Sequence, residues 1–203
     1  MSKPLPIVKC GHPVLRTRAR EVPAEELRTE EFRKLVRKMV DAMRAAPGVG
    51  LAAPQIGVDQ RVIVLEDAER LMSKLSPAER AARGRVPVPL TCIVNPVLTL
   101  VRTEPVTFFE GCLSVPGFMA LVERAVEVRV TGTNEKGEPI DWTVSGWPAR
   151  ILQHECDHLE GTLYVDRMLT RTFGANDEVL ARWAAMDPAD VRARLARPGA
   201  EGA

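Results

Sequence analysis

The apolar residues between positions 26 and 45 recur at three- and four-residue spacing, which is typical of one face of an amphipathic helix. They are Phe32, Leu35, Val36, Met39, Val40 and Met43. Arginine, lysine and glutamate fill the opposite face, so the pattern predicts a helix over residues 26–45, ended by Pro47 and Gly48. The next segment, residues 48–57 (GVGLAAPQIG), is rich in glycine and is predicted to be a turn or loop.

Two strand-like stretches follow this loop. Residues 61–66 (RVIVLE) and 91–100 are rich in β-branched side chains, and Asn95-Pro96 interrupts the second stretch, which predicts a bulge or a sheet edge. Residues 67–90 between them are charged and contain prolines, so we expect a long surface excursion with a short helix.

The second half of the chain predicts a hairpin and then helices. Residues 125–133 and 138–145 flank the turn sequence NEKG, which predicts an antiparallel hairpin. A second helix is predicted near Pro148, with Gly161 placed to end it. Residues 174–203 are expected to form a C-terminal helix with a frayed tail from residue 197. Segregated strands and helices indicate an α+β fold.

Length and charge narrow the class of protein. A chain of 203 residues is enough for one domain with a core, and we expect a single domain over residues 1–203. Its 28 Lys and Arg nearly balance 27 Asp and Glu, so there is no net positive electrostatic field to favour binding of nucleic acid or an anionic membrane. We expect a cytoplasmic protein, because no signal peptide or membrane span is visible and four widely spread cysteines suit a reducing compartment.

Two of the three histidines lie four residues apart in the sequence HECDH, residues 154–158. On a helix, residues four apart project from one face, so His154 and His158 are predicted to reach one metal ion. Glu155 is offset by about 100° around the helix axis and is placed to reach a metal-bound water without being a ligand. The pattern indicates a metallohydrolase.

A catalytic metal site needs three protein ligands, so one more must come from elsewhere in the chain. Cys156 points away from the histidines and is interpreted as a small buried hydrophobic residue, as are Cys10 and Cys92. Cys112 differs, because it stands in EGCLSVP, residues 110–116, where a glycine lets the backbone approach a ligand. That loop is a candidate source of a thiolate ligand.

Three segments together resemble the signature motifs of peptide deformylases: GVGLAAPQIG at 48–57, EGCLSVP at 110–116 and QHECDHLEG at 153–161. The resemblance covers about residues 7–173. It implies antiparallel and mixed β-sheets packed around a central helix that carries the HExxH motif. It also implies a metal-dependent hydrolase that removes the formyl group from the N-terminal formyl-methionine of nascent polypeptides.

The resemblance also assigns roles by motif position. The implied metal ligands are Cys112, His154 and His158. Glu155 resembles the general base, Gln55 and the backbone N–H of Leu113 resemble the oxyanion donors, and Gly50 resembles the glycine that admits the substrate beside them. The implied lining of a methionine pocket is Val49, Glu110, Trp147, Ile151 and His154. For Trp147, packing under the helix is an equally good interpretation.

Further expectations concern metal, partners and location. The resemblance favours Fe²⁺ in the cell, and Zn²⁺, Ni²⁺ or Co²⁺ also suit a thiolate with two imidazoles. The expected partners are formyl-methionyl nascent peptides, and the ribosome exit is one candidate place for their encounter. The protein is expected to be a monomer or a homodimer. Met119 stands where many bacterial relatives carry arginine, so anchoring of the peptide backbone is expected to differ. GFMA at 117–120 is more similar to the subgroup that includes organellar deformylases, but without a visible transit peptide we expect a bacterial enzyme.

Two alternatives stay open at this point. An HExxH zinc peptidase would use Glu178, twenty residues after His158, as its third ligand. A non-catalytic protein would instead hold its metal in a closed site with four ligands.

Overall fold

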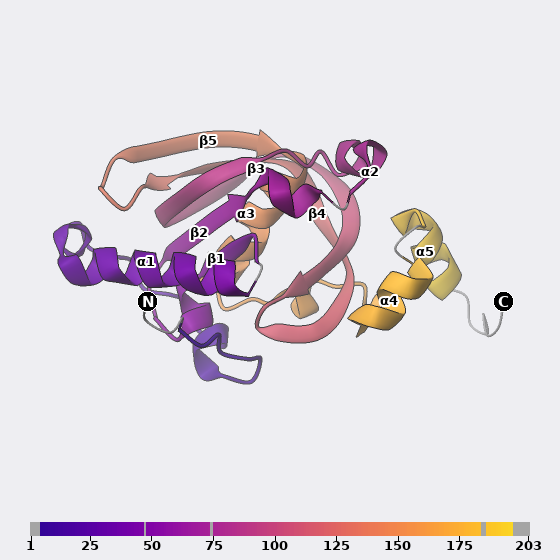
Figure 1. The fold of residues 1–203 in the computed structure, drawn as a ribbon, viewed down its shortest axis with the longest axis horizontal. Coiled ribbons are helices and arrows are strands. Elements are labelled where there is room, and N and C mark those ends of the chain that lie inside the picture. The colour runs from indigo at the N-terminus through magenta and orange to yellow at the C-terminus, as the bar shows by residue number, and fades with distance from the viewer. Residues whose placement is uncertain (1–4, 47, 74, 184–185, 197–203) are drawn as a thin grey trace.

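Long antiparallel strands curve around one helix in the computed structural model, which describes residues 5–46, 48–73, 75–183 and 186–196 (Figure 1). The strands are β1 (Gly50–Ala52), β2 (Val62–Asp67), β3 (Val88–Cys112), β4 (Val115–Thr133), β5 (Pro139–Ser145) and β6 (Gly174–Ala175). Each of β1 to β5 pairs antiparallel with the next, and β6 pairs with β4. The helices are α1 (Glu30–Ala45), α2 (Pro77–Ala82), α3 (Gly146–Leu159), α4 (Asn176–Trp183) and α5 (Pro188–Ala196). The predicted α+β fold is confirmed.

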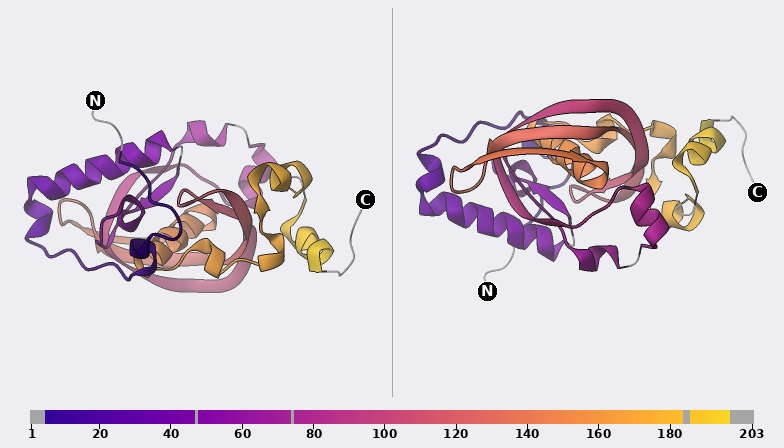
Figure 2. Two further views of the ribbon diagram at one scale, coloured as in Figure 1. Left: turned by 90° about the horizontal axis from the view of Figure 1, so that it is seen from below. Right: turned by 90° about the horizontal axis from the view of Figure 1, so that it is seen from above.

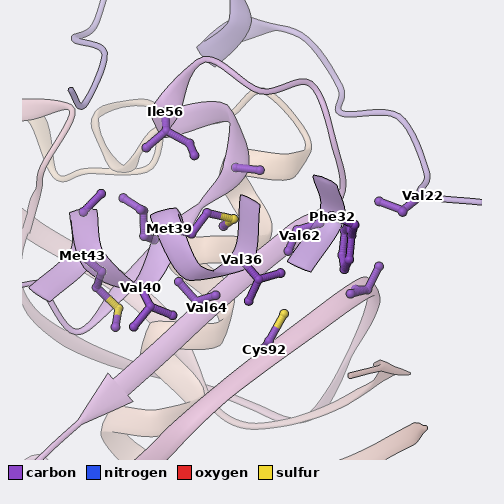
Figure 3. Packing of buried hydrophobic residues seen from close by; sticks show 14 of the residues in the cluster. Val22, Phe32, Val36, Met39, Val40, Met43, Ile56, Val62, Val64 and Cys92 are labelled. Carbon is purple, nitrogen blue, oxygen red and sulfur yellow. The ribbon is translucent and has the colours of Figure 1, made fainter. Parts of the chain in front are cut away.

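The predicted helix at 26–45 begins later than expected. Thr29 is its N-cap and accepts a hydrogen bond from the backbone N–H of Phe32 at 3.1 Å, while Glu26–Arg28 form a short 3-10 turn before it. The apolar face of α1 packs against β2 and β3, as Figure 3 shows. The contacting side chains include Phe32, Val36, Met39, Val40, Met43, Val62, Val64 and Cys92.

The loop predicted for the first motif is wrong at its centre. Gly50–Ala52 form strand β1, which pairs with Ile63–Leu65 of β2, and Ala53–Ile56 form a 3-10 helix. Gly57 ends this helix with a φ of 80°, a value that favours glycine. A local reading of the glycines misses the strand, because the hydrogen bonds that create it come from β2.

Strands β3 and β4 are much longer than the sequence predicts. The ladder runs from Val94↔Thr133 through Glu110↔Ala120 to Cys112↔Val115, so it includes Pro105, where local propensity is unfavourable. The predicted irregularity at Asn95 is confirmed by a φ of 49° and a register shift between Val94 and Val97. The predicted hairpin is confirmed as β4 and β5, and the 67–90 excursion contains a 3-10 turn and α2.

Helix α3 lies inside the curved strands and contacts each of β1 to β5 (Figure 2). Pro148 lies in its first turn, and Gly161 follows its end with a φ of 70°, as predicted. Cys156 and Cys92 are buried as predicted, whereas Cys10 is exposed and its buried interpretation is wrong. The position of α3 brings the HECDH residues to the centre of the molecule.

The C-terminal segment contains two short helices, α4 and α5, where the sequence predicts one. The tail at 197–203 lies outside the described residues. Among the described residues, no helix is long and apolar enough to cross a membrane.

Candidate metal centre and active site

Cys112, His154 and His158 come together where β3 ends beside α3. Each offers one ligand atom, and these atoms all lie within 4.8 Å of one another. The Sγ atom of Cys112 is 3.3 Å from Nε2 of His158, and the two imidazole rings are 5.0 Å apart between centroids. One thiolate and two imidazoles form a donor set that suits a transition metal, and three protein ligands are the number typical of catalytic sites.

The orientation of His154 is set by a carboxylate. Its Nδ1 atom lies 3.0 Å from Oε2 of Glu110, so Nδ1–H donates there and Nε2 remains for a metal. Burial opposes protonation, but hydrogen bonds with Cys112 and Glu110 outweigh it and raise the pKa of His154 well above its usual value. For His158, burial lowers the pKa well below its usual value, which favours the neutral form that binds metals.

Two donors point at the sulfur of Cys112. Nε2 of Gln55 lies 3.5 Å from Sγ, and the backbone N–H of Ser114 donates to Sγ at 3.4 Å. The backbone N–H of Ala52 donates to Oε1 of Gln55 at 2.9 Å, which fixes the side-chain amide with its NH₂ group toward the sulfur. Donors of this kind orient a sulfur atom that serves as a metal ligand. Leu113 lies in the turn between Cys112 and Ser114.

Glu155 is enclosed next to the three candidate ligands. It is 4% exposed, its Oε2 atom is buried without a partner among the described residues, and burial raises its pKa to about 7. A Cβ atom on Gly50 would lie 2.3 Å from Oε1 of Glu155. The space that Gly50 leaves is therefore occupied by the Glu155 carboxylate, a role that motif position alone does not reveal.

Sequence reasoning assigns Glu110 to the pocket lining and misses its partners. Glu110 lines the cavity, but its carboxylate accepts hydrogen bonds from Nε and Nη2 of Arg124 at 3.0 and 2.9 Å, and from Arg150 at 2.6 Å. Burial alone would raise the pKa of Glu110, but hydrogen bonds from His154 and Arg124 hold it well below the usual range. Glu110 thus links His154 to two buried arginines.

The buried charges continue on α3. Arg124 also donates to Asp157, which accepts two further bonds from Arg167, each 2.7 Å long. Arg150 precedes His154 by four residues, which is about one helical turn. That spacing alone predicts that Arg150 lies on the same face of the helix as His154. Arg124 has no comparable local signal, because it reaches the site from strand β4.

A cavity of about 460 Å³ opens beside the candidate ligands. Its lining includes the pocket residues expected from the sequence: Val49, Glu110, Trp147, Ile151 and His154. Trp147 also packs edge-on against Phe108, with ring centroids 6.1 Å apart, so it both lines the cavity and belongs to a packed cluster. Gly50, Gln55, Leu113 and Glu155 share the lining. By contrast, Glu178 is exposed on α4 and pairs with Arg182, outside the lining.

Comparisons with known proteins match this chain to one family. The family model described as polypeptide deformylase matches residues 4–173. "Peptide deformylase 1A, chloroplastic" of Solanum lycopersicum is 52% identical over 167 residues, which are 82% of this chain and 60% of that protein's length. "Peptide deformylase 1" of Streptomyces coelicolor is 46% identical over 185 residues, which are 91% of this chain and 83% of that protein's length. The chain thus spans less than two thirds of the length of the tomato relative.

Solved structures extend the likeness to the fold. The Met-Ala-Ser bound class I type b peptide deformylase of Acinetobacter baumannii is 36% identical, with a TM-score of 0.73, covering 83% of this chain and 100% of that one. Residues 4–173, which the family model matches, include all three motifs and every residue of the cavity lining named above from Val49 to Glu155. On the family model and these identities, the chain belongs to the polypeptide deformylase family.

Proposed function

We propose that this protein hydrolyses the formyl group from the N-terminal formyl-methionine of nascent peptides and releases formate, using one divalent metal ion held by Cys112, His154 and His158. The observation that carries the proposal is the gathering of these three ligand atoms within 4.8 Å beside the enclosed carboxylate of Glu155. Such a metal ion supplies a Lewis acid, which polarises a carbonyl and lowers the pKa of water. The donor set suits Fe²⁺ as the metal in the cell, with Zn²⁺, Ni²⁺ or Co²⁺ as substitutes.

The remaining steps belong to the protein's own side chains. Glu155 accepts the proton of the attacking water and delivers a proton to the amine that leaves. Nε2 of Gln55 and the backbone N–H of Leu113 donate to the formyl oxygen as negative charge develops on it. The methionine side chain enters the cavity against Val49, Trp147 and Ile151. Because the amide of Gln55 is already oriented by Ala52, its contribution needs no reorganisation.

The test is formate release from formyl-Met-Ala-Ser by metal-loaded protein. We expect Cys112→Ser to lose both bound metal and formate release, because the thiolate is one of three ligands. Glu178→Ala should keep both. Cleavage of unformylated peptides, abolished by Glu178→Ala, would instead support the peptidase alternative. Metal bound without any exchangeable water would support the closed structural site.

Replacing Gly50 by alanine tests the placement of Glu155. The new Cβ would clash with Oε1 at 2.3 Å, so the carboxylate must move. We expect Gly50→Ala to lower kcat about 10²-fold or more while the metal content stays the same, since proton transfer depends on the position of the carboxylate. Full activity of Gly50→Ala would show that Glu155 is not held in this position during turnover.

We also propose that the protein works in the bacterial cytoplasm on chains leaving the ribosome. The relatives include both organellar and bacterial proteins: the tomato protein is named as chloroplastic, whereas the Streptomyces coelicolor protein is bacterial. Detecting formylated N-termini on cytoplasmic proteins after depletion of this protein would test the location. Its state as monomer or homodimer stays a prediction.

A further inference from the structure

Two phenylalanines stack on each other at the rim of the cavity. The rings of Phe118, in β4, and Phe173, just before β6, have centroids 5.1 Å apart and an interplanar angle of 10°. The residues are 42% and 41% exposed. Phe118 also lines the cavity that contains Cys112 and Glu155. Large aromatic rings exposed at the mouth of a cavity form an apolar surface suited to binding.

Backbone contacts hold this aromatic pair in place. Phe118 pairs with Ala175, and Met119 pairs with Gly174, so strand β6 fixes Phe173 beside β4. The hydroxyl of Tyr164 donates to the carbonyl oxygen of Phe118 at 3.1 Å. The surface is therefore formed in advance, and a ligand that binds to it need not order it.

The substrate is the occupant that reaches this surface. A linear peptide advances about 3.3 Å per residue when extended, so one or two residues after the methionine are enough to carry the chain from the cavity to its rim. Phe118 belongs to both the cavity and the exposed pair, which makes the two surfaces continuous. Asn176, directly after β6, also lines the cavity, and its Oδ1 atom is buried without a partner among the described residues. The segment from Phe173 to Asn176 thus contributes both an apolar and a polar group at the rim.

We propose that Phe118 and Phe173 form a specificity site for the side chain of a residue downstream of the formyl-methionine, with a preference for aromatic and large apolar side chains. This inference rests on the proposed function, because it takes the formyl group to react beside Cys112 and Glu155. A planar side chain would lie against the stacked pair, and an acidic one would gain nothing there. The expected preference is modest, since aromatic contacts of this kind correspond to roughly two- to tenfold in an equilibrium constant.

The experiment compares kcat/KM for two series, formyl-Met-Xaa-Ser and formyl-Met-Ala-Xaa, with Xaa as Ala, Leu, Phe or Asp. In at least one series, we expect the parent to prefer Phe over Ala by about fivefold, mainly through KM. Phe173→Ala should bring that ratio close to one and leave hydrolysis of formyl-Met-Ala-Ser within about twofold of the parent. Val97→Ala, at another exposed apolar residue (62%) outside the cavity lining, should retain the preference.

A second substitution covers the case in which Phe173→Ala weakens the fold. Phe173→Leu keeps apolar bulk against Phe118, and should lower the preference for Phe while that for Leu persists. A preference for Phe that is equal in the parent and in both Phe173 variants would overturn the proposal. So would a parental dimer that Phe173→Ala dissociates without changing the preference, because a second copy would then cover the pair. A parent that releases no formate from any peptide would overturn the proposed function as well, which distinguishes the two failures.

Discussion

Glu155→Gln is expected to lower kcat for formate release by about 10²- to 10⁴-fold, the range that a positioned general acid–base group contributes. The carboxylate is enclosed beside the proposed metal ligands. Within the part of the chain that the structure describes, its Oε2 atom has no hydrogen-bond partner, and burial raises its pKa to about 7. A carboxyl group in this condition exchanges protons near neutral pH. Glutamine has nearly the same shape and no proton to transfer, so fold and metal binding should persist. The measurement is kcat with formyl-Met-Ala-Ser, together with metal content.

A control for this experiment exists at the end of the same helix. Glu160 is the C-cap of α3, and its side chain is 46% exposed and paired with Arg18 and Arg61. Glu160→Gln should keep kcat close to that of the parent. If Glu155→Gln retained parental kcat with metal bound, proton transfer would have to be assigned to another group.

Arg124→Met is expected to lower the free energy of unfolding by about 3 kcal/mol, because it removes one partner from a buried ionic network. Arg124 is 5% exposed and donates to both Glu110 and Asp157, two carboxylates that are themselves buried. In the variant, Glu110 still pairs with Arg150 and Asp157 still pairs with Arg167. The expected stability loss therefore lies at the lower end of the range for broken buried pairs. Urea denaturation measures the loss directly, and the melting temperature should fall by about 10 °C.

Arg129 provides a matched comparison in the same strand. Like Arg124, it donates through Nε and Nη2 to the two oxygens of a single carboxylate, that of Asp141. The Arg129–Asp141 pair is exposed, so Arg129→Met should change stability little, as is usual for surface ion pairs. Equal stability losses in the two variants would mean that burial of the Arg124 network has no special effect.

Local patterns in the sequence determined much of this protein. The apolar spacing of α1 and the turn signals around Gly161 concern neighbours within a few residues, and the structure confirms both. The spacing of His154 and His158 places both imidazoles on one face of a single helix, whatever the helix packs against. The three motifs together indicated the family, which the comparisons show.

Only the tertiary structure decided what surrounds the two histidines. Cys112 and Gln55 meet because β3 and the 3-10 helix after β1 both pack beside α3, and no periodicity in either segment encodes that meeting. The partners of Glu110 and the space that Gly50 leaves for Glu155 also come from distant elements. Local patterns specify which face of a helix or strand is apolar. Which distant residue contacts that face depends on strand pairing and packing over the whole chain. The geometry of the site therefore follows from these long-range contacts and not from local sequence patterns.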